Sequence, residues 1–409
     1  MHGTWLRARL APVVAFALAM TTVAALVAPA QVAGAAPVAP TFDRRTLQVS
    51  GDATPFLGYF NKDDTTDIFW LGDGTKPDAM WFGVPGQRGR FTKVNLRFDG
   101  HYRVIVGQFA SDGVNDILLW GLGSAPDLYL QPNGGKTVFD VSKVDIPYGG
   151  LTSAIVLTDY DAWDDILFFG FGSLPDQVWH FSDTGSGEYA IKNTRIDTTR
   201  GYVLNGYFND DGLQDLFIYG QGSAPDALWL GRSDGNFTKR SMSVGGAFVP
   251  TAFPRPNGLS GIYWSAYGGH PDQLWRATSS GGFKNTKTAT YNESGNVNAN
   301  GVPQPASAFE WALGHLVLFS REFATEDLVD NGSSDNSVEM YKGLNHPADT
   351  KNNGYSGLGN ADFDGDGNGD ILWFHAGAPP DEVDYGLTAA TASKQRPTRG
   401  SLGRGSLGG

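Results

Sequence analysis

The amino-acid sequence predicts an all-β protein, a seven-bladed β-propeller with four-stranded blades whose ring is closed by an N-terminal strand. One pattern recurs along the chain: Gly-x-Phe, an acidic loop, an aspartate before a short apolar run, a glycine turn and a Pro-Asp pair. In the fullest copies, the aspartate before the apolar run is Asp67, Asp116, Asp165 and Asp215, which gives spacings of 49, 49 and 50 residues. A period of about 50 residues made of short strands is typical of propeller blades.

The number of blades follows from a second aspartate at a fixed distance from the first. A Pro-Asp aspartate lies eleven residues after the first position of each clear copy, at Asp78, Asp127, Asp176, Asp226, Asp272 and Asp381. The fifth copy has Gly261 at the first position, and the last copy has Asp370. The 109 residues between these two positions are two periods. We therefore expect a degenerate sixth copy near residues 314–343, and seven blades in total.

Each copy contains four segments with the character of strands. The apolar runs at 68–71, 117–120 and 216–219 are four residues long, β-branched or aromatic, and bounded by Gly, Asp or Asn. An alternating segment such as 91–96 precedes the Gly-x-Phe, and another, such as 227–230, follows the Pro-Asp pair. The pattern therefore predicts strands throughout.

The sequence also predicts how the ring closes. Residues 42–50 match the strand that begins at Phe91, and both begin sixteen residues before a Gly-x-Phe. This early strand precedes the first blade, whereas the last copy has no such strand after Tyr385. We expect residues 42–50 to complete the last blade, which removes an exposed sheet edge.

The two ends of the chain differ from the repeats. Arg7 and Arg9 precede an apolar stretch at 10–27 and small residues at 28–30 and 33–35, so we expect residues 1–35 to be a signal peptide. An uncleaved membrane anchor is the alternative. Residues 36–41 are then a short linker, 42–387 the propeller, and 388–409 a disordered tail rich in Ser, Gly and Arg. The mature protein is expected to be secreted, extracellular and without a membrane span.

Charge and cysteine content exclude several classes of function. Loss of the leader changes the formal charge from −13 to about −15, which argues against a nucleic-acid partner. The chain has no cysteine, which excludes disulfides and thiol catalysis. Rigidity must then come from the closed ring and its packing. We expect a monomer.

The last copy contains the densest group of candidate metal ligands. Asp362, Asp364, Asp366 and Asp370 occupy positions 1, 3, 5 and 9 of a glycine-rich loop, and the carbonyl of Asn368 lies at position 7. Oxygen ligands at these positions can surround a hard cation, and calcium suits such a crowded shell better than magnesium. The alternative is a loop in which the aspartates bond to their own backbone. Four acids in nine residues would then repel one another, so we favour calcium.

This loop, repeated around a ring behind a signal peptide, resembles the FG-GAP/VCBS repeats of integrin-α-type β-propellers. The resemblance covers residues 42 to about 386, and its motif is complete in the last copy. It implies that calcium binds on one rim of the propeller. Transferred to this chain, the implied ligands are those of the loop at 362–370.

Three other copies keep part of the ligand set. Three oxygen ligands with carbonyls and water can form a weak calcium site, or the same acids can only fix a turn. The weaker metal candidates are Asn61, Asp63 and Asp67 in the first copy, Asp159, Asp161 and Asp165 in the third, and Asn209, Asp211 and Asp215 in the fourth. The second copy keeps only Asp112 and Asp116, for which we favour the turn.

Two further features recur at fixed positions. The Pro-Asp aspartates could form a ring of acids, and Trp81, Trp179, Trp229 and Trp275 could stack on sugars. A position repeated in every blade more often serves the blade itself. We therefore expect the aspartates to accept backbone hydrogen bonds in turns, and the tryptophans to pack between blades.

The function expected from these features is non-catalytic binding. A secreted calcium-binding propeller would present one rim to an extracellular carbohydrate or protein, as a binding or adhesion module. The alternative is an exported hydrolase or lyase acting on extracellular polysaccharide, with its site near the degenerate sixth copy. That copy contains Glu322, Glu326, Asp327, Asp330, Asp335 and Glu339. We predict no catalytic residue, because no nucleophile elbow, zinc-binding helix or phosphate loop is present in the sequence.

Overall fold

The computed structural model describes most of residues 41–387, which belong to one unit spanning 39–409. The residues without a description are 1–40, 50–51, 111, 135–137, 148–153, 159–162, 171–173, 182–187, 197–200, 221–222, 267–271, 288–306, 313–314, 321–322, 330–338, 343–354, 376–379 and 388–409. The expected signal peptide, linker and tail lie outside the described residues. Within the described part of the chain, no helix has the length and apolar character needed to cross a membrane.

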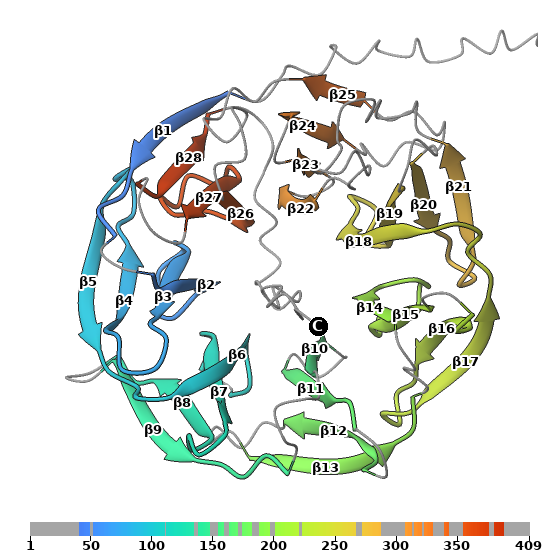
Figure 1. Ribbon diagram of the computed structural model, residues 1–409, viewed down its shortest axis with the longest axis horizontal. Helices are drawn as coiled ribbons and strands as arrows, with labels where there is room; N and C mark the ends of the chain where they lie inside the picture. The colour runs from blue at the N-terminus through green and yellow to red at the C-terminus, as the bar shows by residue number, and fades with distance from the viewer. Residues whose placement is uncertain are drawn as a thin grey trace, which may run out of the picture. The chain divides into compact units, whose positions relative to one another are not determined.

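The described strands form seven four-stranded sheets (Figure 1). The first sheet consists of β2 (Thr54–Gly58), β3 (Asp67–Leu71), β4 (Asp78–Gly83) and β5 (Phe91–Leu96). The second consists of β6 (His101–Gly107), β7 (Asp116–Leu122), β8 (Leu128–Pro132) and β9 (Phe139–Lys143). The third consists of β10 (Ala154–Thr158), β11 (Asp164–Phe168), β12 (Asp176–Phe181) and β13 (Tyr189–Thr194). The fourth consists of β14 (Gly201–Gly206), β15 (Asp215–Gly220), β16 (Asp226–Gly231) and β17 (Phe237–Met242).

The remaining sheets continue this order along the chain. The fifth consists of β18 (Phe248–Pro254), β19 (Ser260–Ala266), β20 (Gln273–Ala277) and β21 (Phe283–Lys287). The sixth consists of β22 (Ser307–Ala312), β23 (His315–Ser320), β24 (Phe323–Val329) and β25 (Glu339–Lys342). The closing sheet consists of β26 (Tyr355–Ala361), β27 (Asp370–His375), β28 (Glu382–Gly386) and β1 (Phe42–Thr46). The sixth sheet occupies the region where a degenerate copy was expected.

The repeated residues mark the strand ends of each sheet. In the first sheet, the glycine of Gly-x-Phe ends β2 and pairs with Asp67 at the start of β3. The acidic loop therefore connects the first two strands, and the Pro-Asp pair lies just before or at the start of β4. All pairings within a sheet are antiparallel, which suits strands joined by short loops.

The closing sheet joins the two ends of the ring. Strand β1 pairs antiparallel with β28, from Phe42 opposite Gly386 to Thr46 opposite Glu382. Strand β5 of the first sheet has the same register, since Phe91 lies opposite Gly83. The pairing predicted for the strand at 42–50 is therefore confirmed over Phe42–Thr46.

Apolar side chains fill the spaces between neighbouring sheets. Five clusters join the closing sheet to the first, the first to the second, and so on as far as the fifth. Strand β22 of the sixth sheet lies against β18 and β26. Each described sheet thus packs on the next around a common axis (Figure 1). The prediction of an all-β propeller is confirmed.

Candidate functional site

The aspartate before each apolar run fixes the loop that precedes it. Asp67 is fully buried, and its two carboxylate oxygens accept hydrogen bonds from the backbone N–H groups of Phe60 at 2.9 Å and Gly83 at 3.0 Å. Asp215 and Asp370 accept the equivalent pairs of bonds. This acid therefore ties the loop to the end of the third strand in its sheet.

The Pro-Asp aspartates accept a different pair of backbone hydrogen bonds. Asp78 accepts N–H bonds from Gly72 at 2.7 Å and from Phe98 at 2.5 Å, and so links its turn to the connection with the next sheet. The equivalent pairs occur at Asp127, Asp176 and Asp226. The expectation that these acids accept backbone hydrogen bonds is confirmed.

The repeated tryptophans also serve the fold. Trp81, Trp179 and Trp229 are buried, and each belongs to an apolar cluster that joins two sheets. Trp275 packs against such a cluster between the fourth and fifth sheets. They are interblade core residues, as expected.

In the first and fourth copies, the aspartate of the weaker candidate site accepts hydrogen bonds from its own turn. The Nδ2 of Asn61 donates to Asp63 at 2.8 Å, and Asp63 also accepts from the N–H of Thr65 at 2.9 Å. Asn209 and Asp211 repeat this arrangement in the fourth sheet. Both acids are thus hydrogen-bonded within their turns, and their roles as weaker metal ligands stay predictions.

The structure describes only one of the three candidates in the third copy. Asp159 and Asp161 lie outside the described residues. The Oδ1 of Asp165 accepts a hydrogen bond from the N–H of Phe181 at 3.0 Å, and its Oδ2 lies 2.6 Å from Nδ1 of His180.

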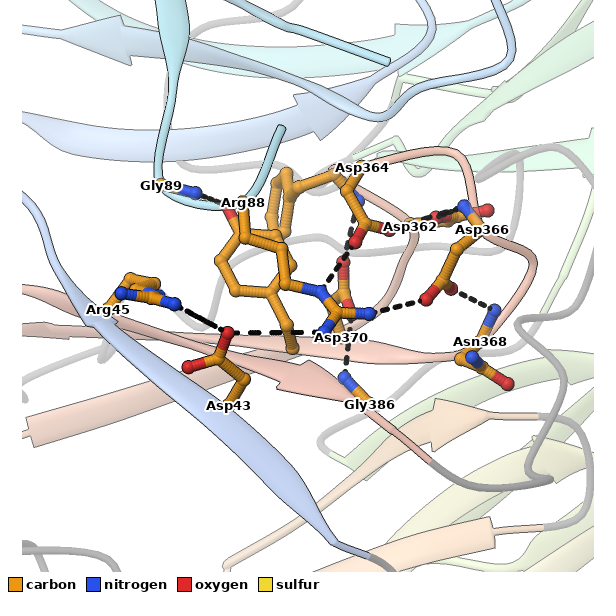
Figure 2. A network of polar contacts seen from close by, with 12 residues as sticks. Asp43, Arg45, Arg88, Gly89, Asp362, Asp364, Asp366, Asn368, Asp370 and Gly386 are labelled. Atoms are coloured by element: carbon orange, nitrogen blue, oxygen red, sulfur yellow. Dashed lines mark hydrogen bonds and ion pairs between the residues drawn. The ribbon is translucent and has the colours of Figure 1, made fainter. Parts of the chain in front are cut away.

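The last copy brings three buried carboxylates together. Asp362, Asp364 and Asp370 each place one oxygen within 4.8 Å of the others, and their exposed fractions are 6%, 4% and 0%. Among the described residues this is the one group of at least three potential metal-ligating side chains. Three of the five ligands predicted from the sequence are therefore adjacent in space (Figure 2).

The loop backbone supplies hydrogen bonds to these carboxylates. Asp362 accepts from the N–H groups of Asp366 at 3.1 Å and Gly367 at 2.9 Å. Asp364 accepts from the same N–H of Asp366 at 3.2 Å. Gly365 and Gly367 have φ of 73° and 85°, a region that glycine adopts without strain. The two glycines thus allow the loop to curl around its own acids.

A positive side chain from the next sheet reaches the same loop. Arg88, in the turn between β4 and β5, donates from Nε to Asp364 and from Nη2 to Asp366, both at 2.8 Å (Figure 2). Asp366 also accepts from the N–H of Asn368 at 2.8 Å. Asp366 is thus turned toward Arg88 rather than into the three-carboxylate group. Its role and that of the Asn368 carbonyl as ligands stay predictions.

The carboxylates of this loop are buried and have little positive charge near them. Burial, with smaller contributions from nearby Asp364 and Asp366, raises the pKa of Asp362 to about 6. Burial likewise raises the pKa of Asp370 well above its usual value. The loop has four carboxylates, and the Arg88 guanidinium bonds to two of them, so a bound cation would reduce their mutual repulsion.

The donor set fits a hard divalent cation. All side-chain ligands are oxygens, the carboxylates converge, and the glycine-rich loop can adjust around an ion. Asp362, Asp364 and Asp370 would be the first ligands. The loop is therefore a candidate metal centre.

Neighbouring sheets are also joined by a recurrent pair of hydrogen bonds that we did not predict from the sequence. The N–H of Asn115 donates to the carbonyl of Tyr59 at 2.7 Å, and the N–H of Tyr59 donates to Oδ1 of Asn115 at 2.8 Å. This interblade bond pair recurs between Asp164 and Gln108, between Ser260 and Tyr207, and between Thr66 and Asp362. The sequence pattern that could have revealed it is a polar residue directly before Asp67, Asp116, Asp165 and Gly261, at Thr66, Asn115, Asp164 and Ser260.

The same loops surround a pocket of about 550 Å³ on this rim. It lies where the loops of the closing, first and second sheets meet. Its lining residues are Tyr59, Asn61, Lys62, Asp63, Asp64, Gln108, Asp112, Gly113, Val114, Asn115, Asp362, Gly365, Asp366 and Gly367. The pocket therefore adjoins the candidate metal centre, and most of its lining residues are polar or charged.

The alternative site in the sixth copy is described only as backbone. Glu326 and Asp327 lie on β24 and Glu339 on β25. Glu322, Asp330 and Asp335 lie outside the described residues.

Comparisons with known proteins agree with the fold. A scan against protein-family models found no match, and a search of curated proteins found none. Similar solved structures include an Agrocybe aegerita lectin whose structure explains recognition of non-reducing terminal N-acetylglucosamine, with a TM-score of 0.55 and 14% identity over 73% of this chain and 82% of that chain. A candidate 6-phosphogluconolactonase from Bacteroides fragilis has a TM-score of 0.41 and 10% identity over 68% and 81% of the two chains. At this identity, the first likeness supports the propeller fold alone, and the second carries no argument.

Proposed function

We propose that this chain is a secreted, calcium-binding module that binds an extracellular carbohydrate without catalysis. In this proposal the seven sheets act as seven four-stranded blades of an FG-GAP/VCBS-like propeller. The observation that carries the binding role is the rim pocket formed by three equivalent loops. It is bordered by a group of buried carboxylates that suits a cation.

The chemistry of the pocket walls favours a polyhydroxy ligand. Carboxylates and the side-chain amides of Asn61, Gln108 and Asn115 can exchange hydrogen bonds with hydroxyl groups, and the half-buried ring of Tyr59 offers an apolar face. Saccharides present hydroxyls and apolar faces together. The Agrocybe lectin is a precedent for carbohydrate binding on a propeller, and we extend that role to this chain as part of the proposal.

Calcium is assigned a structural role beside the pocket. The proposed ligands are Asp362, Asp364 and Asp370, with Asp366 and the carbonyl of Asn368 as further oxygen donors. A bound ion would supply positive charge to the buried acids and would fix the loop that forms one wall of the pocket.

A glycan-array screen of residues 36–409, with calcium and with a chelator, tests this function. We expect a defined set of saccharides to bind, more strongly with calcium. Lys62→Trp should block binding, because Lys62 is exposed at the pocket. Asp210→Trp is the matched control, since Asp210 is exposed at the same loop position of the fourth sheet, outside the pocket. Equal binding by the two variants would place the ligand elsewhere, and no binding to any glycan would refute the proposal.

A further inference from the structure

The rim pocket has a strong excess of negative charge. Five of its lining residues are aspartates, at positions 63, 64, 112, 362 and 366, and Lys62 is its one lysine or arginine. Asp362 and Asp366 are proposed calcium ligands, so the negative electrostatic potential that a ligand meets in the pocket comes chiefly from Asp63, Asp64 and Asp112.

The hydrogen bonds of these acids leave most of this charge in place. Asp63 accepts from the amide of Asn61 and from Thr65, and Asp112 accepts from the N–H of Val114 at 3.1 Å. These donors are neutral. Asp366 faces the guanidinium of Arg88, but that contact lies on the side of the loop toward β4 and β5. Asp64 is exposed at the pocket.

A second and independent feature of the pocket is a buried acceptor without a partner. Gln108 lines the pocket with an exposed fraction of 2%, and its Oε1 accepts no hydrogen bond from any described residue. Its backbone N–H and carbonyl are already used in the interblade bond pair with Asp164. The Gln108 carboxamide thus lies at the pocket with a buried oxygen that no described residue bonds, and buried acceptors are rarely left unbonded.

The negative charge of the pocket and the unbonded oxygen of Gln108 favour the same kind of ligand. Carboxylates and a carboxamide oxygen are acceptors, so the ligand should be rich in N–H and O–H donors and should carry positive charge. Resting on the carbohydrate-binding function proposed above, we propose that the pocket takes a saccharide with a protonated amine, such as a glucosamine oligomer. The ammonium group lies among Asp63, Asp64 and Asp112, and Gln108 accepts a hydrogen bond from the sugar.

The charge of the ligand separates this proposal from general carbohydrate binding. Acetylation of the amine removes its positive charge and leaves the hydroxyl groups of the sugar unchanged. A uronate would add negative charge to a negative pocket. We therefore expect the order of affinity to be glucosamine oligomer, N-acetylated oligomer, then anionic glycan.

Calorimetric titration of residues 36–409 with a glucosamine oligomer and its fully N-acetylated counterpart, at low and high salt, tests the proposal. We expect at least ten-fold tighter binding of the amine form at low salt, and a smaller difference at high salt because exposed charges are screened. The Asp64→Asn/Asp112→Asn double variant should weaken binding of the amine form about ten-fold and that of the acetylated form little. Asp211→Asn is the matched control, because Asp211 has the loop position of Asp112 and accepts the corresponding N–H bond outside the pocket.

Gln108→Met provides a separate test of the buried acceptor. It should weaken binding of the amine form several-fold, without lowering the melting temperature, since no described hydrogen bond of the free protein depends on Oε1. An unchanged affinity would overturn the role of Gln108.

The outcomes distinguish this inference from the proposed function. Equal affinity for the amine and acetylated forms refutes the amine preference but leaves carbohydrate binding intact. If no saccharide binds, both fall. If calcium displaces the amine in proportion to its own binding, the pocket is a cation site and the saccharide assignment is wrong.

Discussion

The ion pair between Arg44 and Asp384 should be the strongest single contact that joins the two ends of the ring. Arg44 on β1 donates from Nε and Nη2 to the two oxygens of Asp384 on β28, at 2.6 and 2.9 Å. Asp384 is 1% exposed, whereas the Arg44 side chain is 29% exposed. Replacement of Arg44 by Met leaves a buried carboxylate without its positive partner.

The expected cost follows from this burial. Removal of one partner from a fully buried pair costs about 3–5 kcal/mol, and partial access of water to Arg44 reduces this to about 2 kcal/mol. The Nε1 of Trp373 still donates to Asp384 at 3.1 Å, which also limits the loss. Arg45→Met is the matched control. Arg45 pairs with Asp43 at the surface, with side chains 53% and 27% exposed, so its loss should cost less than about 0.5 kcal/mol.

Urea unfolding followed by tryptophan fluorescence measures both variants. We expect Arg44→Met to lower the free energy of unfolding by about 2 kcal/mol and Arg45→Met to change it little. The double variant Arg44→Met/Asp384→Asn should recover part of the loss, because the unpaired charge is removed. If the two single variants have the same stability, the pair does not hold the ring closed and the reasoning is wrong.

Three further predictions concern the aspartates. Burial raises the pKa of Asp116 to about 8, above an unfolded value of about 4, so the unfolded state loses its proton first. The free energy of unfolding should therefore fall by about 1.4 kcal/mol per pH unit as the pH rises from about 4 to about 8. Asp116→Asn should flatten that fall in urea titrations at pH 5.5 and 7.5, and an equally steep dependence would contradict the assignment. Asp78→Ala leaves the N–H groups of Gly72 and Phe98 without their acceptor and should cost about 2–4 kcal/mol, with Asp78→Asn in between; a loss below 0.5 kcal/mol for the alanine variant would be inconsistent with the observed bonds. Calcium at 100 times its dissociation constant should stabilise the protein by about 2.7 kcal/mol in thermal melts, and Asp364→Asn should remove most of this effect; a melting temperature insensitive to chelator would exclude the metal site.

Local patterns made much of the fold predictable. The interval of eleven residues between Asp67 and Asp78 spans one strand and one turn, and the same interval recurs around the ring. Each copy repeats one set of strand lengths and turn residues, so the period of the repeat marks each blade. The same comparison shows that the last copy lacks its fourth strand. The Pro-Asp acids and the tryptophans were predictable for the same reason: a residue repeated at one place in every blade meets the same surroundings each time.

The candidate site was predictable only in part. The spacing of aspartates at 362–370 marks a loop that can gather oxygen ligands. It does not show that Asp366 turns to Arg88, a residue 278 positions away in the chain. Nor does it show that the equivalent acids at Asp63 and Asp211 are satisfied by an asparagine two residues earlier.

The sequence by itself determined the repeat, the strand order and the acidic character of the last loop, because these depend on neighbours within about 50 residues. Only the tertiary structure decided which loops of the closing, first and second sheets meet at one pocket, and that Gln108 lies buried there with a free acceptor. Contacts of this kind depend on how separate blades are placed around the axis. Charge and hydrogen bonding act through space, so residues far apart in the chain create the environment that the proposed ligand requires.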